Sequence, residues 1–324
     1  MNSFQYVTAG SPEEAISLVG KNGRYLAGGI DLLGMMKDYI VTPDVLVNVK
    51  DVKMAQPEGN AIRLNGQAYE LGALVTVAEI AAHEELKKAL PGLVEAASEV
   101  GSPQIRNVAS LAGNLLQHSR CWYYRQPDIV CLKRGGSTCY GQEGENKYLS
   151  LFSGCACISP IVSNLATVFA ALNAQVNVRE DAQTSLYSIH KFYQEAWENP
   201  AAHNSLKPQN FILNVSVPTT RARSAYRQQS EKREFDWALV SCAAAGNVTG
   251  GRITDARVAL GAVAPVPYVV EEANQFLEGK ELTAANAAKA ADIILRDAKP
   301  LAHNGYKVPL AHALIRRALL ALNS

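Results

Sequence analysis

The distribution of cysteine constrains this chain more than any other feature of its sequence. Five of the six cysteines lie within one short stretch of the 324 residues: Cys121, Cys131, Cys139, Cys155 and Cys157. Such crowding has three usual causes, which are disulfide bonds, a zinc site and an iron–sulfur cluster. Residues 119–158 are therefore expected to form a loop organised by its thiols.

The context of this loop favours metal ligation over disulfide bonds. The chain starts at Met1 without the basic segment and apolar run of a secretory signal. A chain of this length also folds without disulfide staples. We therefore expect a cytoplasmic protein, and export of the folded chain with a signal-bearing partner is the alternative.

The spacing of the thiols leaves two kinds of metal site open. Structural zinc sites usually contain tight pairs such as C-x2-C. Here nine residues separate Cys121 from Cys131, seven separate Cys131 from Cys139, and seventeen separate Cys139 from Cys157. Wide spacing in a loop suits an iron–sulfur cluster, but spacing alone does not decide between a cluster and zinc.

Two turns rich in small residues precede the cysteines. Residues 25–36 predict a short apolar strand, a Gly28-Gly29 turn and a helix start, and residues 105–116 contain a second such turn. Paired glycines let several backbone N–H groups converge on one point, so the first turn could hold a pyrophosphate. An ordinary strand-to-helix turn is the simpler interpretation of that segment alone. The spacing matches neither a P-loop nor a Rossmann fingerprint.

Composition describes an ordinary globular protein. The chain is 48% apolar and 19% charged, with a formal net charge of +1. We therefore expect no nucleic-acid partner. The sequence contains no run of about 18 apolar residues, so we expect no membrane span.

Local signals predict an α+β chain that divides near Pro218. A strand at residues 211–218 ends at that proline. The remainder predicts three antiparallel strands and then helices. The expected strands are residues 224–229, 237–244 and 253–261, and the expected helices are residues 284–298 and about 306–322.

Four segments, taken in order, resemble one protein family. They are residues 27–33, 104–114, 236–240 and 261–267. Together they are similar to the FAD-binding subunit of the molybdenum hydroxylases, the xanthine dehydrogenase and carbon monoxide dehydrogenase family. The resemblance implies an FAD-binding domain of the two-part vanillyl-alcohol-oxidase/PCMH type over residues 1–218. It implies a C-terminal domain like that of the CO dehydrogenase flavoprotein over residues 219–324.

The cysteine loop resembles an insertion found in one subgroup of this family, which includes aldehyde oxidoreductase and 4-hydroxybenzoyl-CoA reductase subunits. In that subgroup the loop carries a 4Fe–4S cluster near the flavin. The resemblance implies that Cys121, Cys131 and Cys139 are the first three ligands. Aligning residues 163–166 with the helix start of the family selects Cys157 as the fourth ligand, with Cys155 in reserve.

The resemblance also implies a set of FAD contacts. Both turns would hold the pyrophosphate with backbone N–H groups and short side chains, Ile212 would pack beside the flavin, and Asp236 would lie near the isoalloxazine. Asn164 stands where the family usually has Asp, near the ribose and adenine, and Gln228 stands where Lys is frequent. The expected residues of the turns are Ala27, Gly28, Gly29, Ile30, Asp31, Leu32 and Leu33, then Asn107, Ser110, Ala112, Gly113 and Asn114.

The resemblance implies no catalytic side chain in this chain, because the flavin does the redox chemistry. Substrate would react at a molybdenum cofactor on a large partner subunit. Electrons would reach FAD through 2Fe–2S clusters on a small partner, and the 4Fe–4S cluster would extend that relay. Two alternatives are a zinc-stabilised interaction subunit and a stand-alone flavin oxidase.

Overall fold

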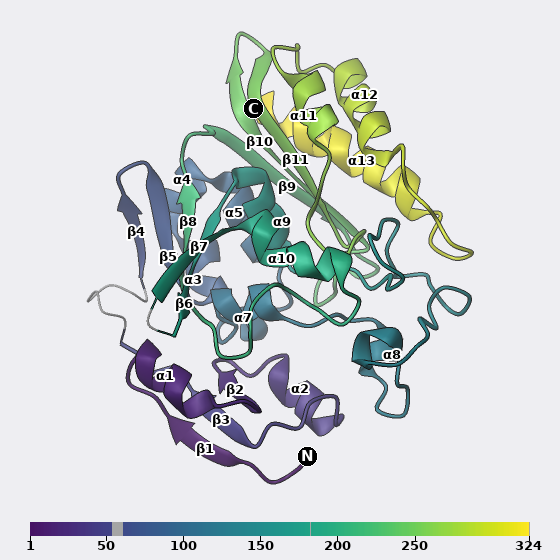
Figure 1. Ribbon diagram of the computed structural model, residues 1–324. Coiled ribbons are helices and arrows are strands. Elements are labelled where there is room, and N and C mark those ends of the chain that lie inside the picture. Colours follow the sequence, from purple (N-terminus) through teal and green to yellow (C-terminus); the bar gives the residue numbers. More distant parts are fainter. Residues whose placement is uncertain (54–60, 182, 324) are drawn as a thin grey trace.

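The described residues form three β-sheets, which pack around three apolar cores (Figure 1). The computed structural model describes residues 1–53, 61–181 and 183–323. The sheets follow one another in the sequence, and within the middle sheet the last strand, β8, lies between β5 and β6. The molecule is therefore an N-terminal lobe, a middle lobe and a C-terminal lobe, as an α+β chain requires.

The N-terminal lobe is a small parallel sheet in the order β1-β3-β2. Ser11 caps the first helix and Pro12 occupies its first position, as the sequence predicts. The core of the lobe includes Phe211 of the middle lobe, whose ring meets Tyr25 edge-on at 5.2 Å. The elements are β1 (Gln5–Thr8), α1 (Pro12–Val19), β2 (Gly23–Leu26), α2 (Leu32–Lys37) and β3 (Val45–Asn48).

The middle lobe is an antiparallel sheet in the order β4-β5-β8-β6-β7, covered by helices. The Asn65-Gly66 hairpin and the capping box of Thr76 and Glu79 are both present. The strands are β4 (Ile62–Asn65), β5 (Ala68–Gly72), β6 (Gln175–Glu180), β7 (Gln183–Ser188) and β8 (Phe211–Pro218). The helices are α3 (Val77–Ala82), α4 (Glu84–Ala89), α5 (Pro91–Ser98), α6 (Pro103–Arg106), α7 (Leu111–Leu116), α9 (Asn164–Leu172) and α10 (Ile189–Glu198).

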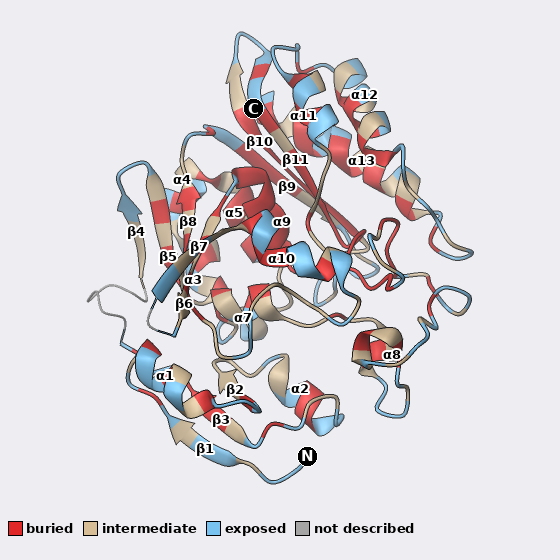
Figure 2. Cartoon of the chain, in the orientation of Figure 1, coloured by how far each residue is buried: buried red, intermediate tan, exposed pale blue. Residues whose placement is uncertain are grey.

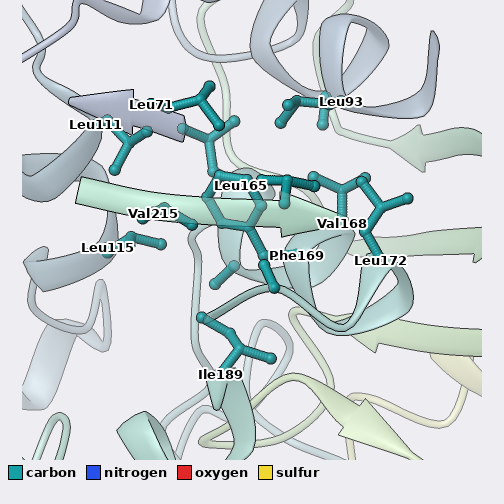
Figure 3. Packing of buried hydrophobic residues seen from close by; sticks show 14 of the residues in the cluster. Leu71, Leu93, Leu111, Leu115, Leu165, Val168, Phe169, Leu172, Ile189 and Val215 are labelled. Carbon is teal, nitrogen blue, oxygen red and sulfur yellow. The ribbon is translucent and has the colours of Figure 1, made fainter. Parts of the chain in front are cut away.

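Helix α9 is the central element of the molecule. All nine of its residues are buried, which is the pattern of a helix surrounded by protein. Phe169 and Leu165 point into the core formed with Leu71, Leu111 and Val215 (Figure 3). The helix also packs against β10 and β11. It therefore joins the middle lobe to the C-terminal lobe.

The C-terminal lobe is an antiparallel sheet in the order β12-β11-β10-β9. Helices α11 and α13 cover one face and α5 and α9 the other, so the first seven residues of β10 are buried (Figure 2). Two elements were not expected from the sequence, the two-residue strand β12 and helix α11. The elements are β9 (Arg223–Gln229), β10 (Val240–Thr249), β11 (Arg252–Gly261), β12 (Tyr268–Val269), α11 (Glu271–Leu277), α12 (Ala284–Leu295) and α13 (Lys307–Leu320).

The cysteine segment between α7 and α9 contains little regular structure. Its described elements are α8 (Trp122–Arg125) and the 3-10 turn η1 (Leu132–Arg134), and it lies beside the middle and C-terminal lobes (Figure 1). The longest helix, α13, has 14 residues, and no helix in the described part of the chain is both long and apolar enough to cross a bilayer.

Candidate functional site

A cavity of about 850 Å³ lies where the three lobes meet. Both small-residue turns line it, together with residues 199–212 and the 235–237 segment. Of the residues expected to contact the cofactor, Leu33 and Asn107 are not in its wall. The expected residues that line it are Ala27, Gly28, Gly29, Ile30, Asp31, Leu32, Ser110, Ala112, Gly113, Asn114, Asn164, Ile212 and Asp236.

The two turns touch through their backbones. A Cβ atom on Gly28 would lie 1.9 Å from the carbonyl oxygen of Val108, so only glycine allows this contact. Gly29 has a φ of +72°, in the left-handed region that glycine tolerates. The backbone of the first turn is thus held directly against the backbone of the second turn.

The turns differ in the state of their N–H groups. Five successive N–H groups, from Gly28 to Leu32, donate no hydrogen bond within the described chain. In the second turn, Leu111 and Ala112 donate to the carbonyls of Val75 and Ala73 at 2.8 and 2.9 Å. The next two N–H groups, of residues 113 and 114, donate to the side chain and the carbonyl of Ser110. Within the described chain, the first turn therefore offers more unpaired N–H groups than the second.

Asp31 anchors the first turn to the cysteine segment. Its carboxylate accepts hydrogen bonds from Arg125 at 2.8 Å and from the N–H of His118 at 2.8 Å, and pairs with Arg120 at 2.9 Å. Burial opposes ionisation of Asp31, but the two guanidinium groups outweigh it and lower its pKa. The Asp31 side chain thus positions the turn and does not cap α2.

Neutral hydrogen bonds hold the opposite wall. Ser163 caps α9 and donates to the buried Asn114 at 2.6 Å. Asn164 donates to the side chain of Gln228 at 3.1 Å. The two side chains that the resemblance singled out, Asn164 and Gln228, are therefore in contact as a neutral amide pair.

A small aromatic cluster separates the cavity from the cysteines. The rings of His118 and His203 stack at 3.9 Å, and both line the cavity. Tyr124 contacts both rings and shares a 2.5 Å hydrogen bond with His118. Burial lowers the pKa of His118 to about 4, so this imidazole is neutral at pH 7.

Four thiols share a second, much smaller cavity on the far side of Tyr124. They belong to Cys121, Cys131, Cys139 and Cys157, and none of them forms a disulfide bond. A hydrogen bond from Cys157 lowers the pKa of Cys139 to about 6. Cys155 does not line this cavity, and its sulfur lies 3.9 Å from the hydroxyl of Ser153.

The thiols are not arranged around a single ion. Across the described ranges of the chain, no three His, Cys, Asp or Glu side chains are close enough together to hold one metal ion. In a 4Fe–4S cluster each thiolate binds a different iron, so its sulfurs stand farther apart than around zinc. The donor set of four thiols around one cavity suits a cluster.

Sequence reasoning missed several residues of the wall. The segment 199–207 brings His203 into place, and Tyr25 holds that wall by donating to the carbonyl of Gln209 at 2.7 Å. His118 and Arg120 adjoin the first cysteine, which was the one local signal available for them. The other contacts join residues more than 80 positions apart.

Two family descriptions match nearly the whole chain. Residues 2–220 match the FAD binding domain in molybdopterin dehydrogenase, and residues 224–322 match the CO dehydrogenase flavoprotein C-terminal domain. The chain belongs to the FAD-binding family of the molybdopterin dehydrogenases. It is an oxidoreductase flavoprotein subunit of the molybdenum hydroxylase type.

Relatives within this family match over their full length. The chain is 30% identical to the aldehyde oxidoreductase FAD-binding subunit PaoB of Escherichia coli K12, over 98% of each chain. It is 25% identical to the carbon monoxide dehydrogenase medium chain of Hydrogenophaga pseudoflava, over 98% of this chain and 96% of that one.

Solved structures share the fold. A chain of quinoline 2-oxidoreductase from Pseudomonas putida 86 superposes with a TM-score of 0.75 at 23% identity, over 99% of this chain and 97% of that one. A chain of reconstituted CO dehydrogenase from Oligotropha carboxidovorans gives a TM-score of 0.77 at 22% identity, over 99% and 98%. At these identities the likeness establishes the architecture of the three lobes.

Proposed function

We propose that this protein is the electron-transfer subunit of a heterotrimeric molybdenum-dependent oxidoreductase and carries both FAD and a 4Fe–4S cluster. Its partners would be a large subunit with the molybdenum cofactor, where substrate is oxidised, and a small subunit with 2Fe–2S clusters. The names of the full-length relatives, an aldehyde oxidoreductase subunit and a CO dehydrogenase medium chain, support this assignment.

The row of unpaired N–H groups from Gly28 to Leu32 is the observation that carries the FAD assignment. Buried or half-buried N–H groups rarely lack an acceptor, and a pyrophosphate supplies several anionic oxygens. We expect the first turn to bind the diphosphate and Ser110 and Asn114 to contribute short polar side chains. Bound FAD would supply the exchange between two-electron and one-electron chemistry.

The four thiols of the smaller cavity are the proposed cluster ligands. Cys121, Cys131, Cys139 and Cys157 provide the set of four thiolate donors that such clusters require. Binding would replace the hydrogen bond between Cys139 and Cys157. The cluster would add an electron store next to the flavin cavity, across the wall formed by Tyr124 and His118.

Neither alternative function accounts for these observations as well. A structural zinc clip needs ligands gathered around one ion, which the described residues lack. A stand-alone oxidase does not explain why the full-length relatives are described as a subunit and a medium chain. We also propose that the boundary between the two domains, residues 1–218 and 219–324, lies in the link between β8 and β9.

Spectroscopy of the full chain, purified without oxygen, tests both cofactors. We expect a flavin spectrum with about one FAD per chain, and about four iron and four sulfide per chain. Zinc without sulfide, or a colourless protein that does not take up FAD, would overturn the proposal. Cys157→Ser should lose the iron, whereas Cys155→Ser, the matched control, should keep it.

A further inference from the structure

Lys133 is a buried cation in the wall of the cysteine cavity. It lies in η1, two residues after Cys131, and is 8% exposed. It lines the same small cavity as the four proposed ligands. An ammonium group removed from water in this way needs compensating charge or several good acceptors.

The hydrogen bonds of Lys133 satisfy only part of its donor capacity. Its Nζ donates to the carbonyls of Pro200 at 3.1 Å and Ala202 at 2.7 Å. An ammonium has three N–H bonds, so one is left for another acceptor. Over the described parts of the chain, no carboxylate oxygen forms a salt bridge with Lys133. The four thiols line the same cavity and would supply anionic groups there once they bind iron as thiolates.

Lys307 is a second buried lysine and provides a comparison, because no thiol is among its hydrogen-bond partners. It is fully buried and donates to the carbonyls of Tyr148 and Ala262 at 3.0 and 2.8 Å. Burial alone lowers the pKa of Lys307 to about 7. Lys133 likewise donates to two carbonyls, but it also shares the lining of its cavity with four thiols.

The charge of Lys133 favours the reduced form of an anionic neighbour. A 4Fe–4S cluster held by four thiolates is negatively charged, and reduction adds one more negative charge. A fixed positive charge nearby therefore stabilises the reduced state more than the oxidised state, and low polarity enlarges the effect. Net charge and hydrogen bonds to sulfur are recognised determinants of the potential of such clusters.

We infer that Lys133 is the residue that sets the reduction potential of the proposed cluster. The inference rests on the proposed function, because it requires the cluster to be present. The two carbonyls that Lys133 holds belong to the segment that also carries His203, which lines the flavin cavity. Lys133 thus fixes the wall between the two cavities while placing its charge on the cysteine side.

A potentiometric titration of the full-length protein, followed by electron paramagnetic resonance, tests this inference. Lys133→Gln removes the charge and keeps a hydrogen-bond donor. We expect it to lower the equilibrium constant for one-electron reduction of the cluster about tenfold, which corresponds to about 59 mV. Lys133→Arg should stay close to the wild type, and the flavin potential should move less than the cluster potential.

Lys147→Gln is the matched control for a cation elsewhere in the cysteine segment. Lys147 pairs with Glu231 at 2.7 Å and its side chain is 44% exposed, so solvent screens its charge. We expect no change of cluster potential in this variant. An unchanged potential in an iron-replete Lys133→Gln protein would overturn the inference.

Iron content resolves the case in which Lys133→Gln fails to hold a cluster. If Lys133→Arg then retains iron, the positive charge is required and the inference stands. If both variants lose iron, Lys133 acts by its shape and the inference fails. A wild-type protein without iron would instead refute the proposed function itself, which separates the two failures.

Discussion

The two turns of the large cavity are similar in composition and different in what they offer a ligand. Among the residues that the structure describes, five N–H groups of the first turn have no acceptor, whereas those of Leu111 and Ala112 in the second turn donate to neighbouring carbonyls. The first is anchored by a half-buried carboxylate, Asp31, and the second by the neutral hydroxyl of Ser110. Small residues alone therefore do not identify an anion site.

The comparison assigns different tasks to the two turns. On the proposed function, the first turn binds the diphosphate with its unpaired N–H groups. The second turn, in which the N–H groups of Leu111 and Ala112 already donate to carbonyls, supports the first. The close approach of Gly28 to Val108 is the contact through which the second turn holds the first in place. Substitutions in the first turn should thus change FAD affinity and stability together, and those in the second turn mainly stability.

Replacing Gly28 by Ala should have the largest effect. The new Cβ would lie 1.9 Å from the carbonyl oxygen of Val108, which is backbone and cannot rotate away. We expect a loss of unfolding free energy of about 3 kcal/mol and failure to retain FAD, from the usual range for severe strain. Chemical unfolding and flavin titration would measure both.

Gly34→Ala is the control for this variant. Gly34 lies in α2 with no atom near the position of a Cβ. The free energy of unfolding of this variant should rise by up to about 1 kcal/mol, because alanine favours a helix more than glycine does. Normal FAD binding by Gly28→Ala would show that the two turns need not touch.

Asp31→Asn should come next. It leaves the half-buried guanidinium groups of Arg120 and Arg125 without their shared anion, at a cost of about 3 kcal/mol. FAD affinity should fall too, since the first turn loses its anchor. Isothermal titration with FAD and urea unfolding would measure the two losses, with the exposed Asp38→Asn as the matched control. Unchanged FAD affinity would remove the distinction between the turns.

The buried imidazole of His118 should also make the apoprotein sensitive to acid. Burial lowers the pKa of His118 from 6.5 to about 4 in the folded chain. Between these values the unfolded state binds more protons, so stability rises with pH from about 4 to 6.5 and is fully present above that window. His118→Gln should flatten this rise by at most about 3 kcal/mol.

Urea unfolding at pH 5 and pH 7.5 would measure the flattening, and the exposed His303→Gln should keep the wild-type slope. Equal slopes in the wild type and His118→Gln would contradict the depressed pKa.

Ser110→Ala should have the smallest effect. The variant loses the side-chain oxygen that caps α7 by accepting from the N–H of Gly113. We expect the free energy of unfolding to fall by about 1 kcal/mol. Thermal unfolding would record the loss, and Ser17→Ala, in an exposed helix position, is the control. A larger fall in FAD affinity for Ser110→Ala than for Asp31→Asn would reverse the roles of the turns.

Local rules recovered much of the fold and part of the site. The caps at Ser11 and Thr76 and the Asn65-Gly66 hairpin depend on neighbours in sequence, so the pattern predicts them. The unpaired state of the first turn could not be predicted in this way. It depends on which N–H groups meet a carbonyl of the turn after β5, and that is decided by tertiary packing.

Long-range contacts account for the other differences. His203 and Lys133 carry no local signal, because the stacking partner of one and the carbonyl partners of the other lie about 70 to 85 positions away. The extra strand β12 has only two residues, Tyr268 and Val269, too few to show a period. Leu33 fell outside the cavity wall because it lies on the exposed side of α2.

Phe211 of β8 belongs to the core of the N-terminal lobe, which limits where the chain can be cut into fragments that fold. A fragment that ends before β8 would carry six of the seven buried residues of that core and lack its one buried aromatic ring. Chimaeras between relatives should therefore exchange β8 together with the first lobe. A junction placed between them would take Phe211 from one relative and the rest of this core from another, so the packed side chains would not match.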